Sequence, residues 1–216
     1  MGKKALIAGI TGQDGAFLAK YLLDKGYEVI GSSRDAKVCN MKNLISLGIK
    51  NEVELVSIAL NDFRSILQAV TNKKPDEIYN LAGLTSVALS YEQPVECMES
   101  IAIANLNFLE VIRYLDRPIR FFNASSSECF GDTKEFVADE NTAFNPVSPY
   151  AVAKCTSFWQ IQNYRKYYNL FCVSGILSNH ESFLRPNRFV TQKIIRSSLE
   201  IKRGERKSLN LGNIDI

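Results

Sequence analysis

The sequence is poor in the features that mark several large classes of protein. Its 216 residues include one histidine and five cysteines, and no two cysteines form a C-x-x-C pair. Such scattered thiols disfavour a zinc site or a disulfide framework, so we predict no metal and reduced cysteines in a cytoplasmic protein. The apolar run near the N-terminus is too short to cross a membrane and lacks a cleavage pattern, so we expect neither a signal peptide nor a membrane partner.

The sequence also lacks a strong charge imbalance. The net charge is +3, and the basic segment from Ile201 to Lys207 is interrupted by Glu205. That pattern is typical of a solvated helix end, so we expect no nucleic-acid partner. With 46% hydrophobic and 23% charged residues, the chain has the composition of a globular protein with one core and room for the start of a second domain.

What the sequence does have is an alternation of short β-branched runs with longer segments of helical period. The predicted strands are Lys4–Gly9, Glu28–Ser32, Val53–Ile58, Glu77–Ala82, Ile119–Ala124 and Phe171–Leu177. The predicted helices are Ala16–Lys25, Met41–Leu47, Phe63–Asn72, Val95–Leu115, Pro149–Tyr168 and Val190–Lys202. Strands separated by helices form βαβ units, which predict an α/β fold with a doubly wound parallel sheet. The longest segment without a period, Gly131–Ser148, is expected to border a ligand.

A glycine-rich loop joins the first predicted strand to the first predicted helix, and it reads Gly9-Ile-Thr-Gly12-Gln-Asp-Gly15. Gly9 permits a tight turn, Gly12 lets the backbone approach a pyrophosphate, and Gly15 lets helix and strand pack closely. The helix N-terminus can then donate backbone N–H groups to phosphates. This context predicts a Rossmann-type dinucleotide site rather than an ordinary turn. The expected cofactor contacts here are Gly9, Thr11, Gly12, Gln13, Asp14 and Gly15.

The end of the second predicted strand indicates which dinucleotide is bound. Arg34 offers a bidentate group to the 2′-phosphate of NADP, whereas Asp35 favours the free ribose of NAD. We predict NADP, because Asp35 can instead point outward as a helix cap. At the end of the fourth strand, the small residues of Leu81-Ala-Gly83 let the backbone pass close to the cofactor.

Two further motifs carry candidate catalytic groups. Tyr150 and Lys154 are four residues apart at the start of a predicted helix, which puts both on one face. A nearby ammonium favours tyrosinate, so we expect the pKa of Tyr150 to lie closer to neutral pH; the alternative is an exposed tyrosine beside a solvated lysine. The fifth strand runs into Ala124-Ser-Ser-Ser-Glu128, where Ser126 can hold a substrate oxygen and Glu128 can line the same cleft. The lone histidine, His180, is a candidate for cofactor positioning rather than catalysis.

Together these motifs resemble the extended short-chain dehydrogenases, and specifically the GDP-mannose 4,6-dehydratase family. The resemblance covers nearly the whole chain. Its most specific pieces, besides the glycine loop and the serine-rich segment, are Ser148-Pro-Tyr-Ala-Val-Ala-Lys154, Asn179-His-Glu-Ser182 and Phe189-Val-Thr191. The Asn-His-Glu-Ser motif indicates the GDP-sugar branch rather than the dTDP- or UDP-sugar branches.

The resemblance implies a lyase that converts GDP-mannose to GDP-4-keto-6-deoxymannose by internal hydride transfer through NADP. Tyr150, assisted by Lys154, would take the C4 hydroxyl proton, and Ser126 would bind the C4 oxygen. Glu128 would take the C5 proton and assist loss of the C6 hydroxyl. The implied cofactor contacts beyond the glycine loop are Arg34, Leu60, Leu81, Ala82, Gly83, Thr85, Tyr150, Lys154, His180 and Arg185. The implied substrate contacts are Ser86, Ser126, Glu128 and Asn179.

The sequence departs from the family pattern at several places. Ala59-Leu60 stands where the family has Asp–Leu, and Glu96 stands where the family has a tyrosine near the cofactor. The segment Phe183–Asn187 differs from the family's Pro-Arg-Arg-Gly-Glu. We expect an NADP-binding domain at 1–180 and the start of the substrate-binding region at 181–216, with the family's C-terminal lobe largely missing. The expected partners are GDP-mannose or a related GDP-sugar and further copies of the chain in a dimer or tetramer.

Other activities remain open from the sequence. A 4-epimerase or a 4-ketoreductase of the same superfamily needs Ser126, Tyr150 and Lys154 but not Glu128, so that carboxylate favours a dehydratase. A dehydratase acting on a GDP-heptose fits the same residues. A truncated, non-catalytic NADP-binding module fits the short chain, although such a module would need none of these four side chains.

Overall fold

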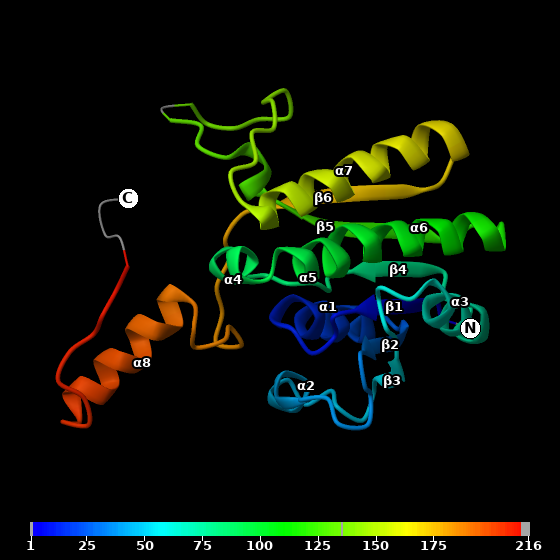
Figure 1. The fold of residues 1–216 in the computed structure, drawn as a ribbon. Helices are drawn as coiled ribbons and strands as arrows, with labels where there is room; N and C mark the ends of the chain where they lie inside the picture. Colours follow the sequence, from blue (N-terminus) through cyan, green and yellow to red (C-terminus); the bar gives the residue numbers. More distant parts are fainter. Residues whose placement is uncertain (1, 135, 213–216) are drawn as a thin grey trace. The chain divides into compact units, whose positions relative to one another are not determined.

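A computed structural model describes residues 2–134 and 136–212, and its centre is a six-stranded parallel sheet (Figure 1). The strands are β1 (Lys4–Ala8), β2 (Glu28–Ser33), β3 (Glu54–Ser57), β4 (Glu77–Asn80), β5 (Arg120–Ser126) and β6 (Cys172–Leu177). Their order in the sheet is β3-β2-β1-β4-β5-β6. The chain therefore winds outward in one direction from β1 and then restarts on the other side at β4. The predicted doubly wound parallel fold is confirmed.

The restart between β1 and β4 determines where a ligand can bind. β1 pairs with β2 on one side and with β4 on the other, with Ala8 opposite Ser32 and Asn80. Connections leave the carboxyl ends of β1 and β4 in opposite directions, and in open α/β sheets the ligand crevice forms at such a point. The glycine loop follows β1 directly, so the fold puts it at this crevice.

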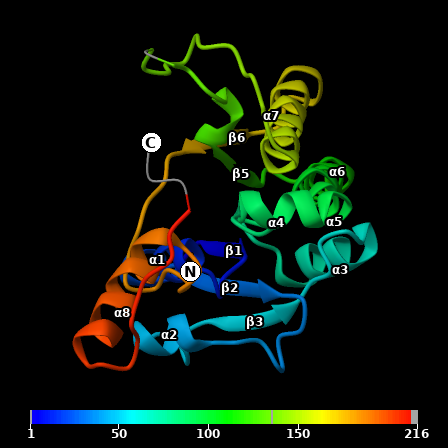
Figure 2. The same cartoon turned by 60° about the vertical axis from the view of Figure 1, so that its left-hand side comes forward.

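Helices from the N-terminal part of the chain cover both faces of the sheet. In chain order, the helices and helical turns are α1 (Gln13–Asp24), α2 (Lys42–Ser46), α3 (Phe63–Lys73), α4 (Val87–Glu92), α5 (Pro94–Met98), the π-helical turn η1 (Glu99–Ile103), α6 (Ala104–Leu115), the 3-10 turn η2 (Ser127–Phe130), α7 (Pro149–Tyr168) and, in the separate C-terminal unit, α8 (Val190–Lys202). Helices α3, α6 and α7 pack in a row on one face, opposite α1 (Figure 2). The main core lies under that row, where Ile66, Phe108 and Ile161 meet Leu6 and Phe121 of the sheet.

Some elements differ from the sequence-based prediction. The predicted helix Val95–Leu115 is broken by η1, whose wider turn is held by contacts from distant residues: Leu84 N–H donates to Ser100 Oγ at 3.2 Å, and Ser157 Oγ donates to the Ile101 carbonyl at 3.4 Å. Helix α4 was not predicted. Strand β5 starts one residue later and ends two residues later than predicted, because Ser125 and Ser126 pair with β6.

The chain divides into two units, Met1–Ser178 and Asn179–Ile216. The first holds the whole sheet, and the second holds α8. No helix within the described residues is long and apolar enough to cross a membrane. All five cysteines are free thiols, and four of them are buried.

Candidate nucleotide and catalytic site

The glycine loop is closed by its own backbone and pressed against its neighbours. The Gly12 N–H donates to the Gly9 carbonyl at 3.0 Å, and Gly9 has a φ of +84°. A Cβ on Gly15 would lie 2.3 Å from the Gly9 oxygen, which is closer than any real contact. Helix α1 starts at Gln13, and no side chain caps it at Gly12. A crowded glycine turn that leads into an uncapped helix N-terminus suits a pyrophosphate.

Polar contacts hold the rest of the loop in place. Asn43, on α2, donates from Nδ2 to the Thr11 carbonyl at 2.9 Å. The Gln13 amide donates to the Asp14 carboxylate at 3.1 Å. The six loop residues expected to contact a cofactor therefore lie together at the carboxyl end of β1.

The segment after β4 forms the other wall of the crevice. The Leu81 N–H continues the ladder to the Ala8 carbonyl at 3.0 Å. Gly83 has a φ of +118°, and a Cβ there would lie 2.9 Å from the Ser100 carbonyl, so only glycine fits comfortably. Ser86 caps α4 by accepting from the Leu89 N–H at 3.2 Å. The backbone of Leu60 accepts from Asn107 Nδ2 at 3.0 Å, which ties the end of β3 to α6.

Arg34 lies just beyond β2 and forms an ion pair that the sequence did not predict. Its Nη2 is 3.5 Å from Oε1 of Glu96 on α5, and the two side chains are 87% and 46% exposed. Asp35 does not take part in this pair, since its Oδ1 accepts from the Lys37 N–H at 2.9 Å. No local pattern links Arg34 to Glu96, because they are far apart in the sequence and meet only in the folded sheet.

The serine-rich segment turns sharply at the end of β5. Ser126 is the last residue of the strand, and its Oγ accepts from the Glu128 N–H at 3.2 Å. That bond caps η2 and positions Glu128 one turn beyond the strand. Ser126 is buried and Glu128 is half-buried. The hydroxyl and the carboxylate therefore leave the same strand end within one short turn.

Tyr150 and Lys154 face this strand end from the first turns of α7. The helix starts cleanly, with Pro149 in its first position and Ser148 Oγ accepting from the Ala151 N–H at 3.1 Å. Lys154 Nζ donates to the Ala124 carbonyl at 2.7 Å and lies 5.6 Å from the centre of the Tyr150 ring. Ser126 lies close enough to Tyr150 for its side chain to favour the ionised phenol. The structure thus brings Ser126, Tyr150 and Lys154 together, and Tyr150 and Lys154 share one face of α7, as their spacing predicted.

The electrostatics of the pair differ from the sequence-based expectation. Burial raises the pKa of Tyr150, and the nearby Ser126 side chain only partly opposes this. Burial also lowers the pKa of Lys154 from 10.5 to about 8, against the pull of nearby groups that include Asp14. The expected lowering of the Tyr150 pKa is therefore wrong for the protein alone. Desolvation disfavours both the tyrosinate and the ammonium. Lys154 therefore loses its proton more readily and supports a charged Tyr150 less.

Three buried thiols that sequence reasoning passed over surround this pair. Cys97 lies beside Lys154 and Tyr150, and Cys155 donates from Sγ to the Cys129 carbonyl at 3.8 Å. Burial raises the pKa of Cys97, and it raises that of Cys155 to about 12. The three buried side chains form a weakly polar wall beside the pair. Within residues 2–134 and 136–212, no cluster of histidine, cysteine and acidic side chains could hold a metal.

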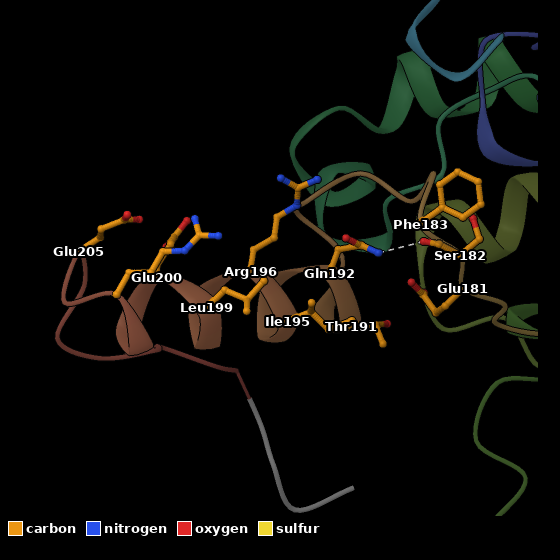
Figure 3. Close-up of a pocket in the computed structure, with 11 residues that line it drawn as sticks. Glu181, Ser182, Phe183, Thr191, Gln192, Ile195, Arg196, Leu199, Glu200 and Glu205 are labelled. Atoms are coloured by element: carbon orange, nitrogen blue, oxygen red, sulfur yellow. Dashed lines mark hydrogen bonds between the residues drawn. The ribbon is translucent and has the colours of Figure 1, made fainter. Parts of the chain in front are cut away.

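The remaining candidates belong to the second unit. Asn179 and His180 open it, and Arg185 stacks on Phe189, with Cζ 3.6 Å from the ring centre. Arg185 Nε also lies 3.4 Å from Glu181 Oε1. The unit has its own pocket of about 700 Å³ between the Glu181–Phe183 segment and α8, where Gln192 Nε2 donates to the Ser182 carbonyl at 2.9 Å (Figure 3).

Comparison with known proteins agrees with this geometry. The model of the GDP-mannose 4,6 dehydratase family matches residues 6–216. The chain belongs to the GDP-mannose 4,6-dehydratase family. A relative from Vibrio cholerae, a GDP-mannose 4,6-dehydratase, is 41% identical over 100% of this chain and 60% of its own length. A relative with the same activity in its name, from Arabidopsis thaliana, is 41% identical over 98% of this chain and 61% of its own length. The chain thus spans about 60% of these relatives.

Solved structures show the same fold at low identity. A dTDP-glucose 4,6-dehydratase from Streptomyces venezuelae with NAD and TYD bound has a TM-score of 0.81 and 20% identity, covering 91% of this chain and 62% of that chain. A UDP-glucose 4-epimerase from Thermus thermophilus in complex with NAD has a TM-score of 0.79 and 23% identity, covering 93% of this chain and 63% of that chain. The resemblance inferred from the motifs is confirmed at the level of family and fold.

Proposed function

We propose that this chain forms the nucleotide-binding and catalytic part of a GDP-mannose 4,6-dehydratase, a lyase that converts GDP-mannose to GDP-4-keto-6-deoxymannose. The observation that carries the proposal is the convergence of four side chains at one strand end. Ser126 and Glu128 leave β5 within one turn, and Tyr150 and Lys154 face them from α7, where Lys154 donates to the Ala124 carbonyl. Membership of the family supports the same activity. We propose GDP-mannose or a related GDP-sugar as substrate, and a homo-oligomer in the cytoplasm as the working form.

The proposed cofactor is NADP, and the crevice beside β1 fits a dinucleotide. The turn from Gly9 to Gly15 has no room for a Cβ at Gly15, and the helix behind it is uncapped at Gly12. Such a turn takes a pyrophosphate on backbone N–H groups. Arg34 supplies a guanidinium at the end of β2, which suits a 2′-phosphate. When bound, NADP would supply the hydride acceptor for C4 of the sugar and the hydride donor for C6.

The chain's own side chains would then move the protons. Ser126 holds the C4 oxygen, and Tyr150 removes the proton from the C4 hydroxyl as that carbon becomes a ketone. The ketone makes the C5 hydrogen acidic, so Glu128 can take it and pass it to the departing C6 hydroxyl, which leaves as water. The proton held by Tyr150 returns to C5. The sugar loses one water in total, and no oxidant is consumed.

Lys154 also takes part in this scheme, through its contacts with Tyr150. It touches both the Ala124 carbonyl and the Tyr150 ring face, so it orients the phenol while lowering the energy of its anion. Because burial makes the phenol hard to ionise, positive charge in the filled crevice would have to assist that ionisation. Tyr150 and Lys154 are buried beside the three thiols, and electrostatic interactions are stronger in such a low-dielectric place.

The decisive experiment is to incubate the purified chain with NADP and GDP-mannose and measure the product by mass spectrometry. A product lighter by one water supports the dehydratase. A product of unchanged mass indicates an epimerase instead. Conversion of a GDP-heptose but not of GDP-mannose would identify the heptose as the substrate. Binding of NADP without conversion of any GDP-sugar would favour a non-catalytic NADP-binding module.

A matched variant assigns the carboxylate. We expect Glu128→Gln to bind NADP as the unchanged chain does and to release no dehydrated product, because an amide cannot take the C5 proton. Loss of NADP binding in this variant would show that Glu128 serves the cofactor site rather than the sugar.

A further inference from the structure

The Arg34–Glu96 ion pair lies at the carboxyl end of β1, a central strand of the sheet. Arg34 follows β2, and Glu96 lies on α5, which leads into η1, where Ser100 packs against Gly83 just after β4. In the sheet, β1 stands between β2 and β4. The contact of 3.5 Å between Nη2 and Oε1 therefore joins the two sides of the crevice into which the glycine loop opens.

Stability does not account for this pair. Both side chains are exposed, and exposed ion pairs contribute on the order of 0 to 1 kcal/mol. What the pair does change is the charge at the mouth of the crevice. A guanidinium there attracts a 2′-phosphate, whereas a carboxylate there repels the phosphate and accepts a hydrogen bond from a free 2′-hydroxyl.

The acidic residue beside Arg34 is held by its own turn. Asp35 Oδ1 accepts from the Lys37 N–H at 2.9 Å, which orients that carboxylate toward the turn rather than toward Arg34. In Rossmann folds the acid that binds the ribose comes from the end of the second strand. Here the carboxylate that reaches the guanidinium comes from α5 instead.

We propose that Glu96 is a cofactor-specificity residue whose carboxylate offsets Arg34, so that the crevice discriminates only weakly between NADP and NAD. This rests on the proposed dinucleotide site. Arg34 favours the 2′-phosphate and Glu96 favours the free 2′-hydroxyl, and each is within reach of the other. The identity of the dinucleotide is then set by two opposed charges rather than by Arg34 alone.

The test is to titrate the full chain with NADP⁺ and with NAD⁺ by calorimetry and compare the two dissociation constants. These nucleotides differ only in the 2′-phosphate. We expect Glu96→Gln to tighten NADP⁺ about tenfold, through removal of a repelling charge, and to weaken NAD⁺. We expect Arg34→Gln to weaken NADP⁺ by about tenfold or more and to change NAD⁺ little.

Glu92→Gln is the matched control, since it removes the same charge from the exposed end of α4. An NADP⁺-to-NAD⁺ ratio that is equal in Glu96→Gln and Glu92→Gln overturns the proposal while leaving the proposed function intact. Failure of the unchanged chain to bind either nucleotide overturns both. The shift in ratio should shrink at high salt, because an exposed charge is screened.

Discussion

Two regions at the carboxyl ends of the parallel strands hold their polar groups differently: one group is buried and the other is exposed to solvent. Where β5 meets α7, Ser126, Tyr150 and Lys154 are each under 10% exposed, and Lys154 donates to the strand. Beyond the end of β2, Arg34 meets Glu96 of α5 in solvent. The first region fixes positions through burial and shifts pKa values by desolvation. The second acts through charge at the surface, which leaves the stability of the fold largely alone.

The contrast predicts which property a substitution in each region should alter. A substitution in the buried region alters proton transfer or the folded state itself, since its groups have few alternative partners. A substitution in the exposed region alters which ligand is preferred.

Tyr150→Phe should lower the rate of the proposed dehydration by about 10³-fold, in the range expected for loss of a general base. Binding of the dinucleotide should be unchanged, because the ring remains. Steady-state kinetics and calorimetry measure the two. The control is Tyr164→Phe on the same helix, whose hydroxyl bonds Glu110, away from the site. Comparable rate losses in both variants would show that α7 matters only as a scaffold.

Lys154→Met should change how stability depends on pH. The Lys154 pKa is about 8 in the folded protein and returns to 10.5 on unfolding, so between these values the unfolded state binds more protons. The wild-type free energy of unfolding therefore gains from this group as pH rises from about 8 to about 10.5 and has no such slope below about 8. The drop of the pKa corresponds to about 3 kcal/mol.

Denaturation of the wild-type chain and of Lys154→Met at about pH 7.5 and about pH 10.5 measures this pH dependence of the free energy of unfolding. The variant's stability relative to wild type should fall by about that amount at the higher pH. Lys166→Met, an exposed lysine on the same helix, should show no such change. A pH-independent difference for Lys154→Met would mean that its ammonium is not desolvated.

Gly15→Ala should destabilise the fold by about 2 kcal/mol, as overpacking does, since the new Cβ meets backbone at 2.3 Å. Gly12→Ala is the informative comparison, because its Cβ has one neighbour, at 3.3 Å. We expect that variant to fold normally and bind dinucleotides poorly, its methyl group occupying the approach to the phosphates. Thermal unfolding separates the two effects. Equal stability of both variants would argue against close packing at Gly15.

The sequence predicted the buried region well and the exposed one poorly, for physical reasons. The observed limits of α7, Pro149–Tyr168, match the prediction because Ser148 and Pro149 are local start signals and Asn169 ends the helix in a left-handed conformation. The pairing of Tyr150 with Lys154 follows from helical spacing. By contrast, the π-helical turn and the Arg34–Glu96 pair depend on residues far apart in sequence, and the Tyr150 pKa depends on how deeply the folded chain buries it.

The smallest effect is expected from breaking the exposed pair. Glu96→Gln should change the free energy of unfolding by less than about 1 kcal/mol, since two solvated side chains gain little from a contact of 3.5 Å. The same variant is the one expected to shift dinucleotide preference. Chemical denaturation with and without about 0.5 M salt, which screens exposed charges, measures the contribution of the pair to stability. A larger loss of stability would mean that the pair holds α5 against β2, and the division between the two regions would then fail at its exposed end.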